Sequence, residues 1–167
     1  MKKNILFLIA GCVLLDQLSK FFARQNFQMP VEVFPFFHLR FVENSGIAFS
    51  LPASRWILIP VIVGVLFFLG RFLWTSTASA IQKIGAALVF SGALGNLIDR
   101  LFFGAVTDFL AFWSFPVFNL ADSFITIGVV LWVWQEIFGQ SKSGKVKKLK
   151  GLKAEKQGSF EEKRRGL

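Results

Sequence analysis

The chain has 167 residues, of which 54% are hydrophobic and only 17% are charged, and its formal net charge is +9. Because soluble domains carry about a quarter charged residues, this composition excludes an ordinary soluble domain and indicates a membrane protein. The single cysteine excludes an internal disulfide and lacks the partners of a metal or redox site, so we expect no metal and no cofactor.

The chain begins with two lysines and an apolar run that passes through Cys12, as the signal segment of a bacterial lipoprotein does. A cleaved segment has a short apolar core and a polar continuation, whereas Cys12 is followed by Val13-Leu14-Leu15 and by apolar sequence up to Phe22. We therefore predict an uncleaved first membrane span from Asn4 to Phe22, in which the cysteine is a small apolar side chain. A lipid-anchored protein modified at Cys12 is the alternative, and mass spectrometry of the chain would distinguish the two.

Three more segments contain the roughly 20 mostly apolar residues that a bilayer core requires. They run from Trp56 to Trp74, from Ile81 to Leu101 and from Val117 to Phe138. Lysines and arginines flank the start of the first span, the connection between the second and third spans, and the end of the fourth span. With four spans, these three places lie on the same side of the membrane. By the positive-inside rule, both termini are predicted to face the cytoplasm.

The connection from Ala23 to Arg55 lies outside in this topology, and it mixes β-branched and aromatic residues with polar ones. Asn44-Ser45-Gly46 is a turn signal, so we predict a small β-hairpin or short sheet within an insertion over about residues 23–55. The expected fold class is an all-α membrane protein with four transmembrane helices and a small extracytoplasmic β-cradle.

The last segment, Gln140–Leu167, holds ten Lys/Arg and three Glu, a balance of +7. Its polar composition predicts a disordered cytoplasmic tail after a four-helix domain that spans residues 1–139. Basic residues beside a last membrane span are typical of orientation signals and attract anionic lipid. We therefore expect membrane lipid, and no nucleic acid, as a partner.

Eight polar or charged residues stand out in the first, third and fourth spans and in the second outer connection. A charge at the bilayer centre costs at least about 2.5–3.5 kcal/mol, so each must pair, line a wet cavity or lie near an interface. In the predicted topology all eight lie near the outer surface, which indicates a site. They are Asp16, Lys20, Asn96, Asp99, Arg100, Asp108, Asn119 and Asp122.

Four of these residues can form ion pairs within their own helices. Asp16 and Lys20 lie at i,i+4 on one helix face, and Asp99 adjoins Arg100 in the sequence. A salt-bridged network that only ties the helices together and a network that serves the site are equally compatible with this spacing.

Asp108 and Asp122 differ, because neither has a basic residue within one helical turn of its own segment. Two carboxylates brought together from a short loop and a helix start would share one proton, as in an aspartic-protease dyad. A helix-capping role is the simpler alternative for either residue. A small proton-coupled transporter could also use both as a relay, but it would require polar residues near the bilayer midplane.

Five motifs, in this order, resemble those of the lipoprotein signal peptidase family, also called signal peptidase II. The motifs are Asp16-Gln17-Leu18-Ser19-Lys20, Glu43-Asn44-Ser45-Gly46-Ile47-Ala48-Phe49-Ser50, Gly92-Ala93-Leu94-Gly95-Asn96-Leu97-Ile98-Asp99-Arg100, Val106-Thr107-Asp108-Phe109 and Phe118-Asn119-Leu120-Ala121-Asp122-Ser123. The resemblance covers about residues 5–138. It departs at Ile47, where Ala is common, at Thr107, where Val is common, and in the short stretch between the two aspartates.

This resemblance implies a monomeric, metal-free intramembrane aspartyl endopeptidase of the bacterial inner membrane, with its active site near the outer face. Its substrates would be prolipoproteins, cleaved before a diacylglyceryl-modified cysteine. Asp108 and Asp122 would form the catalytic dyad. The resemblance places Asn44, Gly46, Asn96, Arg100 and Asn119 near the substrate and gives Asp16, Lys20 and Asp99 supporting roles.

Overall fold

The computed structural model describes residues 2–46 and 55–139. The chain divides into two compact units, Met1–Leu131 and Trp132–Leu167. The predicted basic tail, Gln140–Leu167, lies outside the described residues, as does the end of the second motif, Ile47 to Ser50.

Within the described residues, four helices are long and apolar enough to cross a membrane, which confirms the predicted number of spans. They are α1 (Lys2–Asn26), α2 (Arg55–Thr75), α3 (Ala80–Phe102) and α4 (Leu120–Trp134), and the π-helical turn η2 (Gln135–Gly139) continues α4. Helix α1 extends beyond the predicted Phe22. Helix α4 begins after the predicted Val117, because Phe118 still pairs with the sheet through a β-bridge to Leu110.

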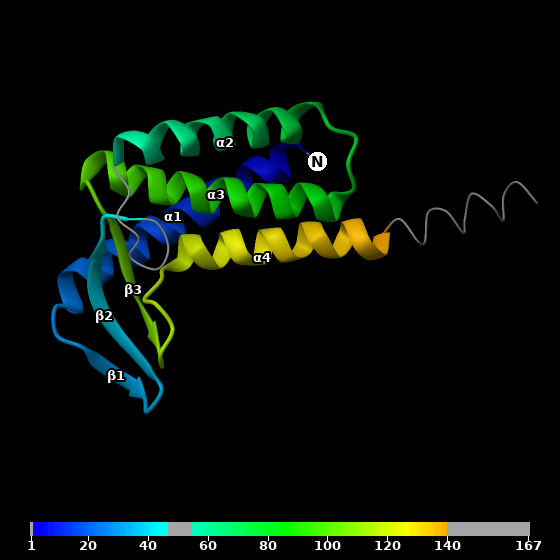
Figure 1. Ribbon diagram of the computed structural model, residues 1–167. Helices are drawn as coiled ribbons and strands as arrows, with labels where there is room; N and C mark the ends of the chain where they lie inside the picture. The colour runs from blue at the N-terminus through cyan, green and yellow to red at the C-terminus, as the bar shows by residue number, and fades with distance from the viewer. Residues whose placement is uncertain (1, 47–54, 140–167) are drawn as a thin grey trace, which may run out of the picture. The chain divides into compact units, whose positions relative to one another are not determined.

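Helix α3 packs against α1 and α2 and has the largest buried face of the four (Figure 1). It begins at a capping box in which Ser79 Oγ accepts from the Gln82 amide at 3.2 Å and Gln82 Oε1 accepts from the Ser79 amide at 3.0 Å. Small residues allow close approach to α4: a Cβ on Gly128 would lie 2.5 Å from the Gly85 carbonyl oxygen. Close packing of small residues is how membrane helices associate without a hydrophobic driving force.

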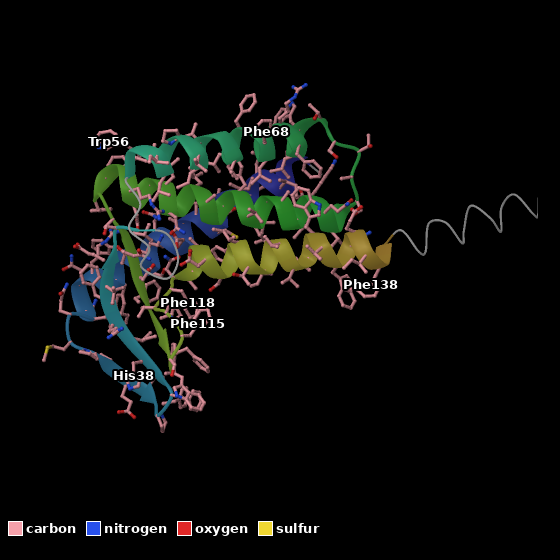
Figure 2. The ribbon with its side chains drawn as sticks, viewed as in Figure 1. His38, Trp56, Phe68, Phe115, Phe118 and Phe138 are labelled. Atoms are coloured by element: carbon pink, nitrogen blue, oxygen red, sulfur yellow. The ribbon has the colours of Figure 1, made fainter. Side chains whose placement is uncertain are left out.

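Helix α2 carries large apolar side chains on its outer side. Trp56 and Phe68 are 73% and 72% exposed, and Figure 2 shows both on the side of α2 that is turned away from α3. Such a surface suits contact with lipid, because a monomeric soluble protein rarely exposes so large an apolar area to water.

A three-stranded antiparallel sheet lies at one end of α1 and α3 (Figure 1). Its strands are β1 (Val31–Phe34), β2 (Phe37–Asn44) and β3 (Val106–Phe112), in the order β1-β2-β3. The small predicted sheet is thus confirmed, but one expectation was wrong: Asp108 lies in a strand, not in a loop. The second connection forms β3 because pairing with β2 satisfies backbone groups that a loop would leave open at the sheet edge.

Candidate active site

Asp108 is positioned by the pairing of β2 with β3. The register sets Asp108 opposite Val42, and Asn44 lies two residues further along β2, so its side chain is on the same face and diagonal to the carboxylate. Asn44 Nδ2 donates to Asp108 Oδ2 at 2.9 Å. The other end of that amide is also held, because Asn44 Oδ1 accepts from the Gly46 amide at 3.1 Å. The Asp108 side chain is therefore fixed, and it is only 2% exposed.

Asp122 is positioned by the start of α4. Asn119 Oδ1 accepts from the backbone N–H of Asp122 at 3.0 Å, and Asp122 Oδ2 accepts from the backbone N–H of Asn119 at 3.3 Å. This reciprocal arrangement is that of a capping box, so the capping role considered for Asp122 exists in the structure. It leaves Asp122 Oδ1 to accept from Asn96 Nδ2 at 2.9 Å, and the residue is half-buried.

Asn119 also connects the two aspartates. Its Nδ2 donates to Asp108 Oδ1 at 2.6 Å, while its backbone and Oδ1 bind Asp122 as described. Asn96 extends the network, because its Oδ1 accepts from Lys20 Nζ at 2.9 Å and from Asn119 Nδ2 at 3.3 Å. The structure thus brings Asp108 and Asp122 into one hydrogen-bonded network with three asparagines.

A buried ion-pair network lies beside this site. The predicted Asp16–Lys20 pair is confirmed, with Lys20 Nζ 2.9 Å from Asp16 Oδ2. The possible pair of Asp99 with its neighbour Arg100 is not among the ion pairs of the described residues. Asp99 instead binds Lys20 at 3.4 Å and Arg24 at 3.0 Å, because consecutive helix residues point about 100° apart and only Asp99 faces α1.

The network also fixes the start of α4. Asp16 Oδ1 accepts from the backbone amide of Ala121 at 3.0 Å, and Gly95 of α3 has no side chain that would overlap the Asp16 carboxylate. Buried carboxylates that receive several charge-assisted hydrogen bonds tie elements together firmly. Helices α1, α3 and α4 therefore meet at Asp16, next to the residues that hold Asp122.

Arg100 reaches from α3 towards the end of β2. Its Nη2 donates to the Gly46 carbonyl oxygen at 3.0 Å and its Nη1 to the Asn96 carbonyl oxygen at 3.3 Å. Within the described part of the chain, Arg100 Nε is the buried side-chain donor that has no hydrogen-bond partner. Such donors are rare in folded proteins, so Arg100 Nε stands out among the polar groups beside the two aspartates.

Burial raises the pKa of Asp108 to about 6, and the charge of Asp122 acts in the same direction. Hydrogen bonds from Asn44 and Asn119 and the charge of Lys20 oppose this shift. A carboxyl with such a pKa retains its proton over part of the mid-range of pH, as a group that exchanges protons with water and substrate must.

Arg24 also belongs to this network, and the sequence-based prediction missed it. Its Nη2 donates to Asp99, and its Nε donates to Thr107 Oγ1 at 2.8 Å. The backbone amide of Thr107 in turn donates to Asp99 Oδ2 at 2.9 Å. The signal was present in the sequence, because Asp16, Lys20 and Arg24 follow each other at intervals of four residues on one face of α1.

The fold and the site define a polytopic membrane protein that holds two linked carboxylates at one end of its spans. The family model described as Signal peptidase (SPase) II matches residues 8–138. Lipoprotein signal peptidases of Bartonella tribocorum and Moorella thermoacetica are each 41% identical to the chain, over 81% and 78% of its length and 89% and 91% of theirs. A solved structure described as a bacterial membrane enzyme matches with a TM-score of 0.77 and 27% identity, covering 84% of this chain and 91% of its own. The chain belongs to the signal peptidase II family.

Family membership confirms the resemblance based on the five motifs and makes the chain a peptidase of a bacterial membrane. It favours the peptidase over the transporter, which required polar residues near the middle of the spans. Helix α1 continues through Cys12 to Asn26, as the first-span prediction requires, and Cys12 is buried.

Proposed function

We propose that the chain is an intramembrane aspartyl endopeptidase in which Asp108 and Asp122 form the catalytic dyad. The observation that carries this proposal is the position of Asn119 between the two aspartates. Its side-chain Nδ2 donates to Asp108 Oδ1 at 2.6 Å, and its backbone N–H and Oδ1 form a reciprocal pair of hydrogen bonds with Asp122. Similarity to lipoprotein signal peptidases supplies the substrate class. The enzyme would remove the signal peptides of prolipoproteins by cleaving before the diacylglyceryl-modified cysteine.

In this mechanism the two carboxyl groups share one proton, because the charge of Asp122 already disfavours ionisation of Asp108 and like charges in one network oppose each other's ionisation. The ionised member accepts a proton from the attacking water, while the protonated member gives its proton to the scissile carbonyl oxygen, so that a neutral gem-diol forms. The C–N bond of the gem-diol then breaks as one carboxyl group gives its proton to the leaving amine and the other carboxylate takes a proton from a diol hydroxyl, which restores the single shared proton. The shared proton belongs to the pair rather than to one residue.

Arg100 is proposed to orient the substrate. A buried donor without a partner costs about 1–3 kcal/mol, so a substrate carbonyl that accepts from Arg100 Nε would remove this cost on binding. Asn44 and Gly46, which hold Asp108 and Arg100 in place, would line the same region. Asn96 and Asn119 would hold the dyad, while Asp16, Lys20 and Asp99 would support it from the adjoining ion-pair network.

The orientation in the membrane is part of the proposal. The sheet, the end of α3 and the start of α4 form one end of the first unit, and Lys3, Arg71 and Lys83 belong to the opposite helix ends. The positive-inside rule then places the termini in the cytoplasm and the dyad near the outer face of the inner membrane. A monomer would admit the apolar signal helix of the substrate laterally from the bilayer.

Cleavage of a lipidated model prolipoprotein tests the dyad. Asp108→Asn and Asp122→Asn should each lower kcat by at least about 100-fold, the typical minimum contribution of general acid–base catalysis. The matched control is Glu32→Gln on the exposed strand β1, which makes the same carboxylate-to-amide change away from the site and should leave the rate unchanged. Circular dichroism would verify that the variants are folded, and near-normal cleavage by either folded aspartate variant would remove the dyad assignment.

A further inference from the structure

A second feature of the first unit is an apolar cavity between α1, α2 and α3, with a volume of about 160 Å³. Its walls include Ile5 and Ile9 of α1, Gly70 and Trp74 of α2, and Lys83 and Phe90 of α3. The cavity lies at the end of the unit where α1 begins and where α2 connects to α3, opposite to the sheet (Figure 1). Asp99 lies sixteen positions after Lys83 on α3, a rise of about 24 Å, so the cavity is distinct from the proposed active site.

Lys83 is the charged residue of this cavity and is only 8% exposed. Lysines are almost never buried to this extent unless they are paired. The ion pairs found in the described residues involve Lys20 and Arg24, and none involves Lys83. Helix α2 contains no acidic residue, and α1 and α3 contain none before Asp16 and Asp99. The ammonium of Lys83 therefore has no carboxylate partner within these three helices near the cavity.

The surroundings of Lys83 add positive charge and an exposed indole ring. Lys3 and Arg71 are exposed at the same helix ends, and Trp74 is 61% exposed where it lines the cavity. An indole ring is typical of the boundary between headgroups and acyl chains. The cavity is mainly apolar and partly open to its surroundings, so an apolar chain can enter it. Apolar walls, the ammonium of Lys83 and further basic residues at the same helix ends match the two parts of an anionic lipid.

We propose that this cavity binds an anionic phospholipid, with part of an acyl chain between the three helices and the phosphate at the ammonium of Lys83. A zwitterionic lipid offers the same acyl chains, but it brings a cation next to Lys83, at helix ends that also carry Lys3 and Arg71, and is therefore disfavoured. The site is separate from the proposed peptidase function, and its occupation is measured by lipid binding rather than by cleavage.

Native mass spectrometry of the full chain in detergent measures this binding. Phosphatidylglycerol and phosphatidylcholine with identical acyl chains are titrated in parallel, and the full chain should bind phosphatidylglycerol more tightly. Lys83→Gln should lower the ratio of the two affinities about fivefold, the effect expected of one basic residue near a lipid phosphate. The control Arg40→Gln, which removes an exposed charge on β2, should leave the ratio unchanged. Equal affinities in the full chain, or equal ratios in the two variants, would overturn the proposal.

Two glycines of α2 test the apolar part of the site independently of the charge. A Cβ on Gly70 would lie 3.6 Å from Phe90 Cε2, an ordinary contact, so Gly70→Leu should fold and fill the cavity. Gly64 faces open space, so Gly64→Leu is the matched control. Gly70→Leu should weaken binding of both lipids by about tenfold or more relative to Gly64→Leu, the loss expected when about two acyl CH₂ groups are excluded. Similar lipid binding by the two variants would refute the site. A dimer of the chain that Gly70→Leu abolishes would also refute it, because the cavity would then be occupied by a second copy of the chain rather than by lipid.

Discussion

Replacement of Lys20 by methionine tests the ion-pair network that supports the proposed dyad. The Lys20 ammonium is fully buried and lies 2.9 Å from Asp16, 3.4 Å from Asp99 and 2.9 Å from Asn96 Oδ1. Methionine retains the apolar stem but leaves the fully buried carboxylate of Asp16 without a cation. Because removal of one member of a buried ion pair costs about 3–5 kcal/mol, Lys20→Met should lower the free energy of unfolding by about that amount.

The stability lost in Lys20→Met should be partly restored by a second substitution. Arg24 still neutralises Asp99, so the unpaired charge in Lys20→Met is that of Asp16. Adding Asp16→Asn removes this charge and keeps an oxygen for the Ala121 amide, so the double variant should be more stable than Lys20→Met alone. Denaturant unfolding in detergent measures all of these, with the exposed Lys3→Met as a control expected to change stability by less than about 0.5 kcal/mol. A loss below about 1 kcal/mol for Lys20→Met, or a double variant no more stable than the single, would refute the reasoning.

Two further predictions concern the pH dependence and the packing of α3 against α4. Burial raises the pKa of Asp108 to about 6 and the proposed dyad must keep one proton, so kcat/KM should fall as pH rises through about 6. Asn44→Leu removes a hydrogen bond that lowers this pKa, so the decline should move to higher pH in that variant. A pH profile that is unchanged in Asn44→Leu would contradict this prediction. The stability contribution of Asp108 has the same sign: its folded pKa exceeds the unfolded value of 3.8, so the contribution is full below about pH 4 and is lost as pH rises through about 6. Gly128→Val should lower stability by about 1–3 kcal/mol, because a Cβ would already lie 2.5 Å from the Gly85 carbonyl oxygen. The control Gly11→Val should cost less than about 1 kcal/mol, because a Cβ on Gly11 would meet no atom within 4 Å. Equal losses of stability in thermal unfolding would count against this contact between α3 and α4.

Proximity in sequence predicted some contacts of the site and failed for others. The Asp16–Lys20 pair follows from a spacing of four residues on one helix, which fixes both side chains on one face whatever the rest of the chain does. The adjacency of Asp99 and Arg100 was misleading, because neighbouring residues on a helix diverge and each side chain binds what its own face meets. Asp99 therefore belongs to the network of α1, and Arg100 contacts the end of β2.

By itself, the sequence determined the number of spans, the presence of a small sheet and the identity of the polar residues that lipid excludes. These depend on composition and on local periodicity, which single segments carry. Only the tertiary structure decided that the second connection becomes β3, that Asn44 and Asn119 both hold Asp108, and that Arg24 joins Asp99. Each of these contacts joins residues more than ten positions apart, so it depends on strand register and helix packing, and no single segment encodes either.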